Sequence, residues 1–246
     1  MPIAEKLYSA QTLPLIVNMI SIVCGHISSA NDLTGESTIA ILKSVRKVAY
    51  LLNSNHASSL GPHPAVYFYS SEGRHKSASY MAITDLVSRL SERKKINDFI
   101  HVRPKFEIFL LEFDYLIQQI NRKYRTAQKS YPFISKFLEQ IVDELKLGKS
   151  LDEALFVLQS QNFDYLSLQK PATITGILGK KFDTEAKSTI FLCEVIKSAP
   201  KCGICNGFLH RNSISIDHIE RRQDLGSSSP DNGQITHPYC NTGYKS

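Results

Sequence analysis

Two pairs of potential metal ligands near the C-terminus constrain the fold of this 246-residue chain more than any other feature. Cys202 and Cys205 are separated by two residues, and His237 and Cys240 have the same spacing. A tight turn lets positions i and i+3 face one ion, and structural zinc sites take four thiolate and imidazole ligands in a tetrahedron. Two matched pairs so close in sequence predict a Cys3His zinc site. Because the segment has little core of its own, we expect it to unfold when zinc is removed.

Between the ligand pairs, the sequence predicts a β-hairpin followed by a short helix. Residues 208–210 form a short apolar run, residues 211–212 suit a turn, and residues 213–219 alternate polar and apolar side chains as a half-buried strand does. Residues 220–231 are rich in Ser, Gly and Pro and indicate an irregular loop. Pro238 suits the first turn of a helix, where its missing N–H does no harm. The prediction is strand, strand, helix, with zinc clamping the two ends.

This arrangement brings several polar side chains near one another. In the alternating strand, Ile214 and Ile216 point to one side together with His218, and Asp217 points to the other. Asp217 and His218 lie at the predicted end of the strand, and Asn241 lies on the predicted helix. We expect the strand end and the helix to face each other across a narrow gap.

The ordered pattern Cys-x2-Cys, Asp-His-Ile, Asn, His-x2-Cys-Asn resembles the HNH endonuclease family, the ββα-metal or His-Me finger nucleases. The resemblance covers residues 200–246, under a fifth of the chain. The family's last knuckle is usually Cys-x2-Cys, and His237 stands in place of the first of those cysteines. The family often has Gly-Gly in the central loop, where this chain has Gly226 alone. Its trailing Lys usually follows the Asn by three residues, whereas Lys245 follows Asn241 by four.

The resemblance implies metal-dependent hydrolysis of DNA phosphodiester bonds by four catalytic residues. His218 would be the general base, since a neutral imidazole titrates near working pH. Asp217 and Asn241 would offer oxygen ligands to one hard cation, Mg²⁺ or Mn²⁺, which stabilises developing charge. Asn232 would fix the loop and hold the base in orientation.

Three cationic residues close to these positions are predicted to contact nucleic acid. Arg221 and Arg222 follow the Asp-His pair, and Lys245 follows Asn241. Beside a phosphodiester site such residues can bind the DNA backbone. His210 is expected to be exposed on the hairpin edge, without an assigned role.

The preceding residues predict a mainly α-helical domain, residues 1–199, joined to the small α+β domain of residues 200–246. Apolar residues recur at helical spacing over several segments. Ser150-Leu-Asp-Glu predicts a capping box that opens a further helix. The segment Ala65–Tyr69 is compatible with a strand or with the start of a helix. The predicted helices are residues 13–25, 36–52, 77–90, 106–124, 132–147 and 184–198.

Part of the helical region is similar to the region that follows the ParB-like domain in GmrSD-type restriction and phage-defence proteins. The similarity rests on residues 61–70, on Gly73-Arg74 and on residues 103–109. The ParB-like domain itself has no counterpart in this chain. The similarity implies a role in restriction or antiviral defence. On the residues alone, Arg103 and Glu107 are expected to pair across one helical turn.

Composition and charge indicate a soluble, cytoplasmic protein without a membrane span. No apolar run approaches about 20 residues, and Cys24 and Cys193 are expected to be buried free thiols, which suits a reducing compartment. The net charge is +6, and residues 89–149 hold 13 Lys and Arg against eight Asp and Glu. This basic segment is compatible with a DNA-backbone footprint and equally with a solvated helix face.

Two alternatives to an independent DNA endonuclease remain open. The first is a non-catalytic zinc module that binds nucleic acid or protein. The second is a nuclease that a defence-system partner protein gates through the helical domain. Because one HNH site cuts one strand at a time, double-strand cleavage would require a homodimer or two visits.

Overall fold

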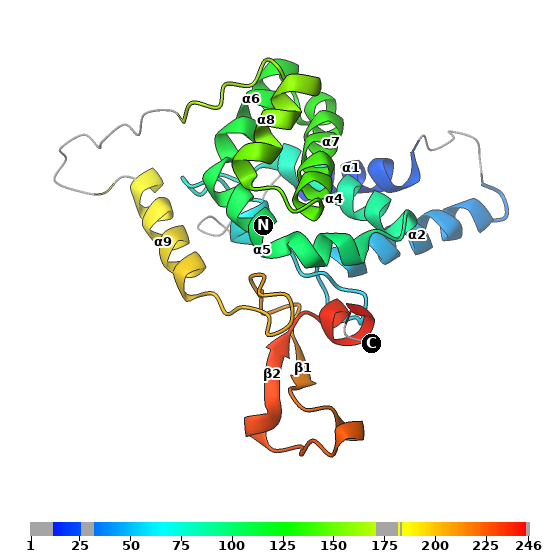
Figure 1. Cartoon of the computed structure of the whole chain (residues 1–246). Helices are drawn as coiled ribbons and strands as arrows, with labels where there is room; N and C mark the ends of the chain where they lie inside the picture. Colours follow the sequence, from blue (N-terminus) through cyan, green and yellow to red (C-terminus); the bar gives the residue numbers. More distant parts are fainter. Residues whose placement is uncertain (1–11, 26–31, 171–181, 183, 245–246) are drawn as a thin grey trace.

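The computed structural model describes residues 12–25, 32–170, 182 and 184–244. They form a helical body from which a two-stranded hairpin arm projects (Figure 1). The helices are α1 Thr12–Cys24, α2 Glu36–Leu52, α3 Pro64–Tyr67, α4 Ser77–Glu92, α5 Ile96–Glu112, α6 Asp114–Tyr124, α7 Ala127–Lys146, α8 Leu151–Gln161 and α9 Thr184–Ser198. The predicted fold class, mainly helical with a small α+β segment at the C-terminus, is confirmed.

Helix α7 lies at the centre of the body because one stripe of it is apolar. Its buried apolar residues recur three and four positions apart, as an amphipathic helix requires: they are Ile134, Phe137, Leu138, Ile141, Val142 and Leu145. This stripe packs against α4, α5, α6 and α8. The Thr126 hydroxyl accepts a hydrogen bond from the Lys129 backbone N–H and caps the N-terminus. At the next helix, Ser150 and Glu153 form the predicted capping box.

The boundaries of two predicted helices are wrong by several residues. The helix expected over residues 106–124 is two helices, because Phe113 leaves the helical conformation between α5 and α6. Helix α5 begins ten residues earlier than expected and contains Pro104, and α7 likewise begins before Pro132. In both helices, burial of an apolar face compensates for the loss of the backbone hydrogen bond that proline cannot donate.

The structure also describes the segment after Gly61, the free cysteines and the apolar character of the helices. The ambiguous segment after Gly61 is the short helix α3. Cys193 is exposed and Cys24 half-buried, so the expectation of two buried thiols is wrong. None of the helices in the described residues is long and apolar enough to cross a membrane.

The hairpin arm consists of β1 Ser215–His218 and β2 Gly233–Thr236, which pair antiparallel. The strand predicted at residues 208–210 is wrong: Phe208 forms an isolated bridge with Lys201, and the partner of β1 lies beyond the loop. That loop contains the 3-10 turns η1 Arg222–Asp224 and η2 Pro230–Asn232. After β2, helical turns begin at Pro238 and continue as η3 Cys240–Tyr244, which has wide π-type turns.

The base of the arm shares its core with the helical body. Cys202, Cys205, Leu209 and Cys240 belong to the same buried cluster as the aromatic residues of α5 and α7. The body therefore supports the arm directly, and the zinc-ligand residues lie at the junction.

Candidate metal centre and active site

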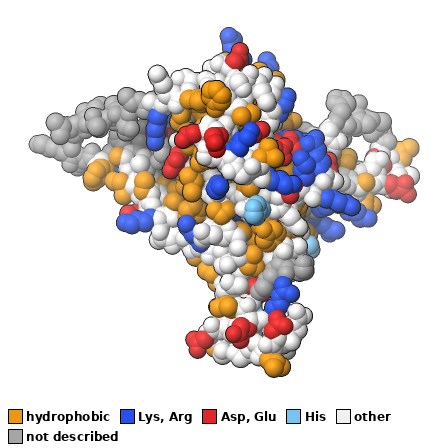
Figure 2. Space-filling model, in the orientation of Figure 1, with side chains coloured by type: hydrophobic (Ala, Val, Ile, Leu, Met, Phe, Trp, Pro, Cys, Tyr) orange, Lys and Arg blue, Asp and Glu red, His pale blue; other side chains and the backbone are white. Residues whose placement is uncertain are grey.

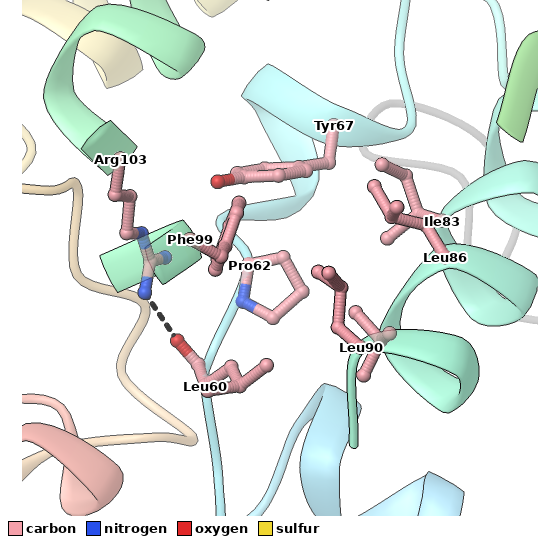
Figure 3. Close-up of a pocket in the computed structure, with 9 residues that line it drawn as sticks. Leu60, Pro62, Tyr67, Ile83, Leu86, Leu90, Phe99 and Arg103 are labelled. Atoms are coloured by element: carbon pink, nitrogen blue, oxygen red, sulfur yellow. Dashed lines mark hydrogen bonds between the residues drawn. The ribbon is translucent and has the colours of Figure 1, made fainter. Parts of the chain in front are cut away.

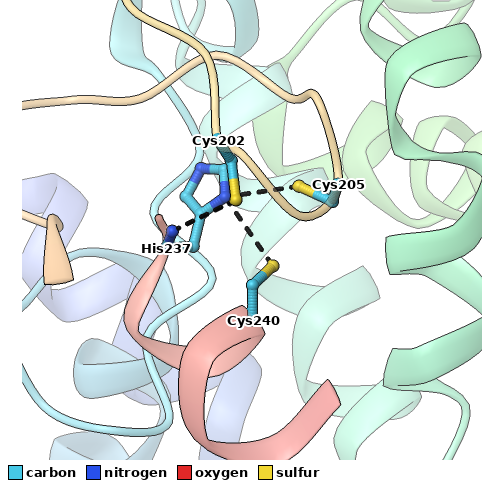
Figure 4. A group of neighbouring side chains, drawn as sticks. All are labelled: Cys202, Cys205, His237 and Cys240. Carbon is cyan, nitrogen blue, oxygen red and sulfur yellow. Dashed lines mark hydrogen bonds between the residues drawn. The ribbon is translucent and has the colours of Figure 1, made fainter. Parts of the chain in front are cut away.

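The four predicted zinc ligands converge at the base of the arm. Cys202 and Cys205 lie in the turn that precedes β1, and His237 and Cys240 lie just after β2 (Figure 4). All four are buried, and their ligand atoms lie within 4.8 Å of one another. Three thiols and one imidazole at this separation fit a structural zinc ion. The residues thus form a Cys3His cluster suited to zinc.

The orientation of His237 also suits a metal. Its Nδ1 atom lies 3.4 Å from Cys205 Sγ and 3.9 Å from Cys240 Sγ, so this nitrogen faces the cluster. Its Nε2 atom lies 3.1 Å from the Phe208 carbonyl oxygen. Donation of the Nε2 proton to that carbonyl leaves Nδ1 as the lone-pair nitrogen, and such a hydrogen bond is what orients most metal-binding histidines.

The thiols compete with one another for protons. The pKa of Cys202 is held well below its usual range, chiefly because its sulfur accepts hydrogen bonds from Cys205 and Cys240. The hydrogen bond to Cys202 raises the pKa of Cys205 to about 11, and hydrogen bonds to Cys202 and Cys205 raise that of Cys240 further. Without a cation only one thiol ionises readily, whereas a bound divalent ion stabilises three thiolates.

On the arm, the polar face of β1 is the buried one. Ser213 and Asp217 are buried, with Asp217 only 8% exposed, whereas Ile216 is 67% exposed. The predicted alternation is correct, but on its apolar side Ile216 faces solvent while Ile214 packs partly against the core. Helix η3 contacts the strand from the other side. Asn241 Nδ2 donates to Ser215 Oγ at 2.8 Å and to the Ile216 carbonyl at 3.2 Å.

Asp217 and Asn241 therefore lie on the same side of the hairpin. Ser215 and Asp217 share one face of β1 by strand alternation, and Asn241 bonds to Ser215. The amide nitrogen of Asn241 makes both of these hydrogen bonds, so its oxygen is oriented away from them. Asp217 Oδ2 accepts a hydrogen bond from Gln234 Nε2 at 3.0 Å. Two oxygen-bearing groups on one face are suited to a hard cation.

His218 follows Asp217 as the last residue of β1 and is half-buried. The backbone that follows it is fixed by Asn232. Asn232 Oδ1 accepts from the Glu220 N–H at 2.8 Å, and its Nδ2 donates to the carbonyls of Glu220 and Ser227 at 3.1 and 2.7 Å. The Asn232 carbonyl accepts from the Ile219 N–H at 2.9 Å. Asn232 thus closes the loop directly after His218.

Of the three cations predicted to contact nucleic acid, Arg221 is exposed beside this loop. Arg222 begins η1, and its side chain lies outside the described part of the structure, as does the whole of Lys245.

His210 is not exposed as expected. It is half-buried against His63, with ring centroids 5.6 Å apart and ring planes nearly perpendicular. Burial lowers the pKa of His63 to about 4, with the neighbouring His210 and Arg103 contributing. His63 is therefore neutral at pH 7, and the two rings pack the arm against the body.

A buried ion pair on α5 holds the base of the arm. Arg103 Nε donates to Glu107 Oε1 at 2.8 Å, and both side chains are almost fully buried. Glu107 Oε2 accepts from the Phe208 N–H at 2.8 Å, so the acid reaches the zinc knuckle. Arg103 also donates to the Leu60 carbonyl at 2.5 Å (Figure 3). Its remaining guanidinium nitrogen donates to the Gly61 carbonyl at 3.1 Å. The apolar cavity beside this pair measures about 10 Å³, which holds one water at most, so it is not a substrate site.

The loop before α3 contacts both halves of the candidate site. Ser59 Oγ lies 2.7 Å from Ser213 Oγ, just before β1, and the Ser59 carbonyl accepts from the Tyr239 N–H at 3.0 Å. Gly61 has a positive φ of 55°, and a Cβ there would lie 2.7 Å from Ser213 Cβ. Sequence reasoning missed this loop and Gln234, because neither carries a motif; only the Gly61-Pro-His-Pro run marked the loop as unusual.

The comparisons with known proteins agree with the geometry of the arm. A model of the HNH endonuclease family matches residues 202–246. No curated protein and no solved structure matches the chain. The matched range begins at the first ligand of the Cys3His cluster and includes the hairpin and η3, so the likeness to HNH endonucleases belongs to this C-terminal segment.

Proposed function

We propose that the chain is a metal-dependent endonuclease that hydrolyses DNA phosphodiester bonds in its HNH segment. The observation that carries the proposal is the juxtaposition of Asp217 and Asn241 on the covered face of β1, within the range that matches the HNH family. In this proposal Asp217 and Asn241 hold a Mg²⁺ or Mn²⁺ ion, which when bound stabilises developing charge on the phosphate. The Cys3His cluster holds a separate, structural zinc ion.

The chain's own residues then have distinct roles. His218 accepts the proton of the attacking water as general base, a role that contributes about 10²–10⁴-fold. Asn232 fixes the backbone after His218 and so positions the base. Arg221, Arg222 and Lys245 contact phosphates near the scissile bond. Residues 200–246 act as the nuclease unit, and residues 1–199 support it or receive a signal from a partner.

The decisive experiment is cleavage of supercoiled plasmid by the zinc-loaded protein with Mg²⁺, Mn²⁺ or no added divalent ion. We expect metal-dependent nicking that His218→Ala reduces by about 10²–10⁴-fold, with zinc content and thermal unfolding unchanged. Gln223→Ala is the matched control, because this exposed, uncharged residue of the following loop has no assigned role. Retained cleavage in His218→Ala would overturn the assignment of the base.

A second candidate, a non-catalytic module that binds a partner protein, is favoured by the apolar surface of the arm. Ile216 and Ile235 are cross-strand partners, and they are exposed together with Ile219 and Leu225. Large exposed apolar groups often mark interaction sites. Absence of cleavage with every metal, in a folded and zinc-loaded protein, would favour this candidate or a partner-gated nuclease.

The biological setting that we propose is restriction or antiviral defence, on the resemblance of residues 61–70 and 103–109 to GmrSD-type proteins alone; the family match lies outside these residues. Cutting both strands would require a homodimer or two successive events, which the ratio of nicked to linear plasmid measures.

A further inference from the structure

Ion pairs neutralise much of the positive charge of the basic segment, residues 89–149. The cations that remain without an ion-pair partner can therefore be identified. Arg89 and Arg93 both contact Glu139, and Arg103 is buried with Glu107. Three further pairs are Lys95–Asp143, Lys146–Asp98 and Lys149–Glu144. Since paired cations attract phosphate less strongly, the segment as a whole is not the nucleic-acid footprint.

Five exposed cations near the arm have no ion-pair partner among the described residues. We call this set the basic shelf; it comprises Lys43, Arg46 and Lys47 of α2, Lys94 in the turn before α5, and Lys105 of α5. Lys47 lines the same groove as Ser91 and Glu92, the residues that lead to the turn of Lys94. Helix α2 therefore lies beside the end of α4 that leads into the turn of Lys94.

The basic shelf flanks the helix that carries Asn241. On the α5 side, Tyr239 Oη donates to Asn97 Oδ1 at 2.8 Å. On the α2 side, Thr242 Oγ1 donates at 2.8 Å to the carbonyl of Ala57, in the loop that follows α2. Figure 2 shows Lys and Arg side chains gathered on the body near α2, and acidic side chains gathered at the tip of the arm. The tip carries exposed Glu220, Asp224 and Asp231.

We propose that the basic shelf binds the phosphate backbone of a DNA duplex whose scissile strand lies at the hairpin arm; this rests on the proposed function. From Asn97 to Lys105, α5 rises about 12 Å, the length of roughly three to four base pairs at 3.4 Å each. Asp224 and Asp231 of the tip repel phosphate, whereas Arg221 and Arg222 follow β1 closely. The duplex therefore approaches from the body side. Lysine contacts to phosphate position a duplex without reading its sequence.

The test measures duplex binding separately from cleavage. Binding of a fluorescently labelled 20-base-pair duplex to the full, zinc-loaded chain is followed by anisotropy without added Mg²⁺, between about 50 and 200 mM salt. The shelf variant is Lys47→Ala/Lys94→Asn/Lys105→Ala, with Asn at position 94 because that residue has a positive φ of 57°. We expect the slope of log K against log salt to fall by about 0.9 for each phosphate that the variant no longer neutralises, and binding to weaken at least tenfold at low salt.

The matched control removes the same charge from the far side of the body. Arg122→Ala/Lys129→Ala/Lys136→Ala changes three exposed residues of α6 and α7 that have no ion-pair partner within the described ranges. We expect the control to keep the wild-type slope. Equal weakening in both variants, no effect of the shelf variant, or no duplex binding by the wild type would overturn the proposal. Duplex binding that depends on the basic shelf, without any cleavage, would support the shelf and count against the proposed nuclease activity. Cleavage that is unchanged in the shelf variant would support the nuclease activity and count against the shelf.

Discussion

At the scale of single residues, Gln234 is the neighbour that orients the candidate metal ligand Asp217. Its amide nitrogen donates to Asp217 Oδ2, and its side chain packs closely over Gly203 of the zinc knuckle. A side chain at position 203 would occupy the same space. Gln234 therefore connects the zinc cluster to the carboxylate proposed to bind the catalytic ion.

Replacing Gln234 by Ala is expected to weaken the response to Mg²⁺. Removal of a residue that hydrogen-bonds a metal ligand typically costs about 10–100-fold in metal affinity or activity. The Mg²⁺ concentration for half-maximal cleavage should therefore rise about tenfold or more. Plasmid nicking over a Mg²⁺ titration checks this, with zinc content measured in parallel. Gln223→Ala, at an exposed loop position, is the control, and an unchanged titration for Gln234→Ala would contradict the positioning role.

At the scale of elements, α5 and the loop before α3 fix the geometry of the arm. The Arg103–Glu107 pair joins the Leu60–Gly61 carbonyls to the Phe208 N–H. A buried pair adds little net stability by itself, but removing one partner leaves an uncompensated charge. The pair thus holds the knuckle in place only while both members are present.

Glu107→Gln is expected to lower the free energy of unfolding by about 3–5 kcal/mol, because it leaves the buried Arg103 guanidinium without a counter-charge. The double variant Arg103→Met/Glu107→Gln should recover part of that stability. Urea denaturation of the zinc-loaded protein measures both. The exposed pair offers a comparison: Lys95→Met, which removes the contact to Asp143, should cost less than about 1 kcal/mol. Equal costs at the two sites would show that burial of the pair is unimportant.

The elements differ in how far the sequence predicts them. Helices such as α2 are recovered to the residue, since a long apolar stripe dominates their local signal. The Cys3His cluster is recovered because zinc-ligand spacing is explicit in sequence. The hairpin partner is not: Gly233-Gln-Ile-Thr is too short to show alternation, and its pairing depends on the Asn232 loop. The exposure of Ile216 escapes prediction because hydrogen bonds and zinc ligands, not apolar packing, cover the other face.

For the molecule as a whole, the metal cluster and the helical core form one buried unit. Cys202, Cys205 and Cys240 lie in the same cluster as Phe106 and Phe137. Loss of zinc would leave three thiols and an imidazole inside that unit. The effect of the metal should therefore extend beyond residues 200–246.

Zinc removal is expected to destabilise the body as well as the arm. After chelation, hydrogen exchange should accelerate along α5 around Phe106, and the melting temperature should fall by several degrees or more, since about 1 kcal/mol shifts it by roughly 2–4 °C in a chain of this size. Cys202→Ser should behave in the same way without chelator, and Cys193→Ser, at an exposed thiol, should not. Faster exchange confined to residues 200–246 would instead mean that the two parts unfold independently.

The chain enters and leaves the arm at the same metal cluster, since Cys205 precedes β1 and His237 follows β2. The arm is thus a closed loop tethered at one point, and lengthening a flexible loop costs little, about 0.6 kcal/mol per doubling. Its Ser-rich stretch near residues 227–229 is exposed. Residues can therefore be inserted at the tip of the arm, which changes the contacts that the tip makes while the base at the metal cluster stays unchanged.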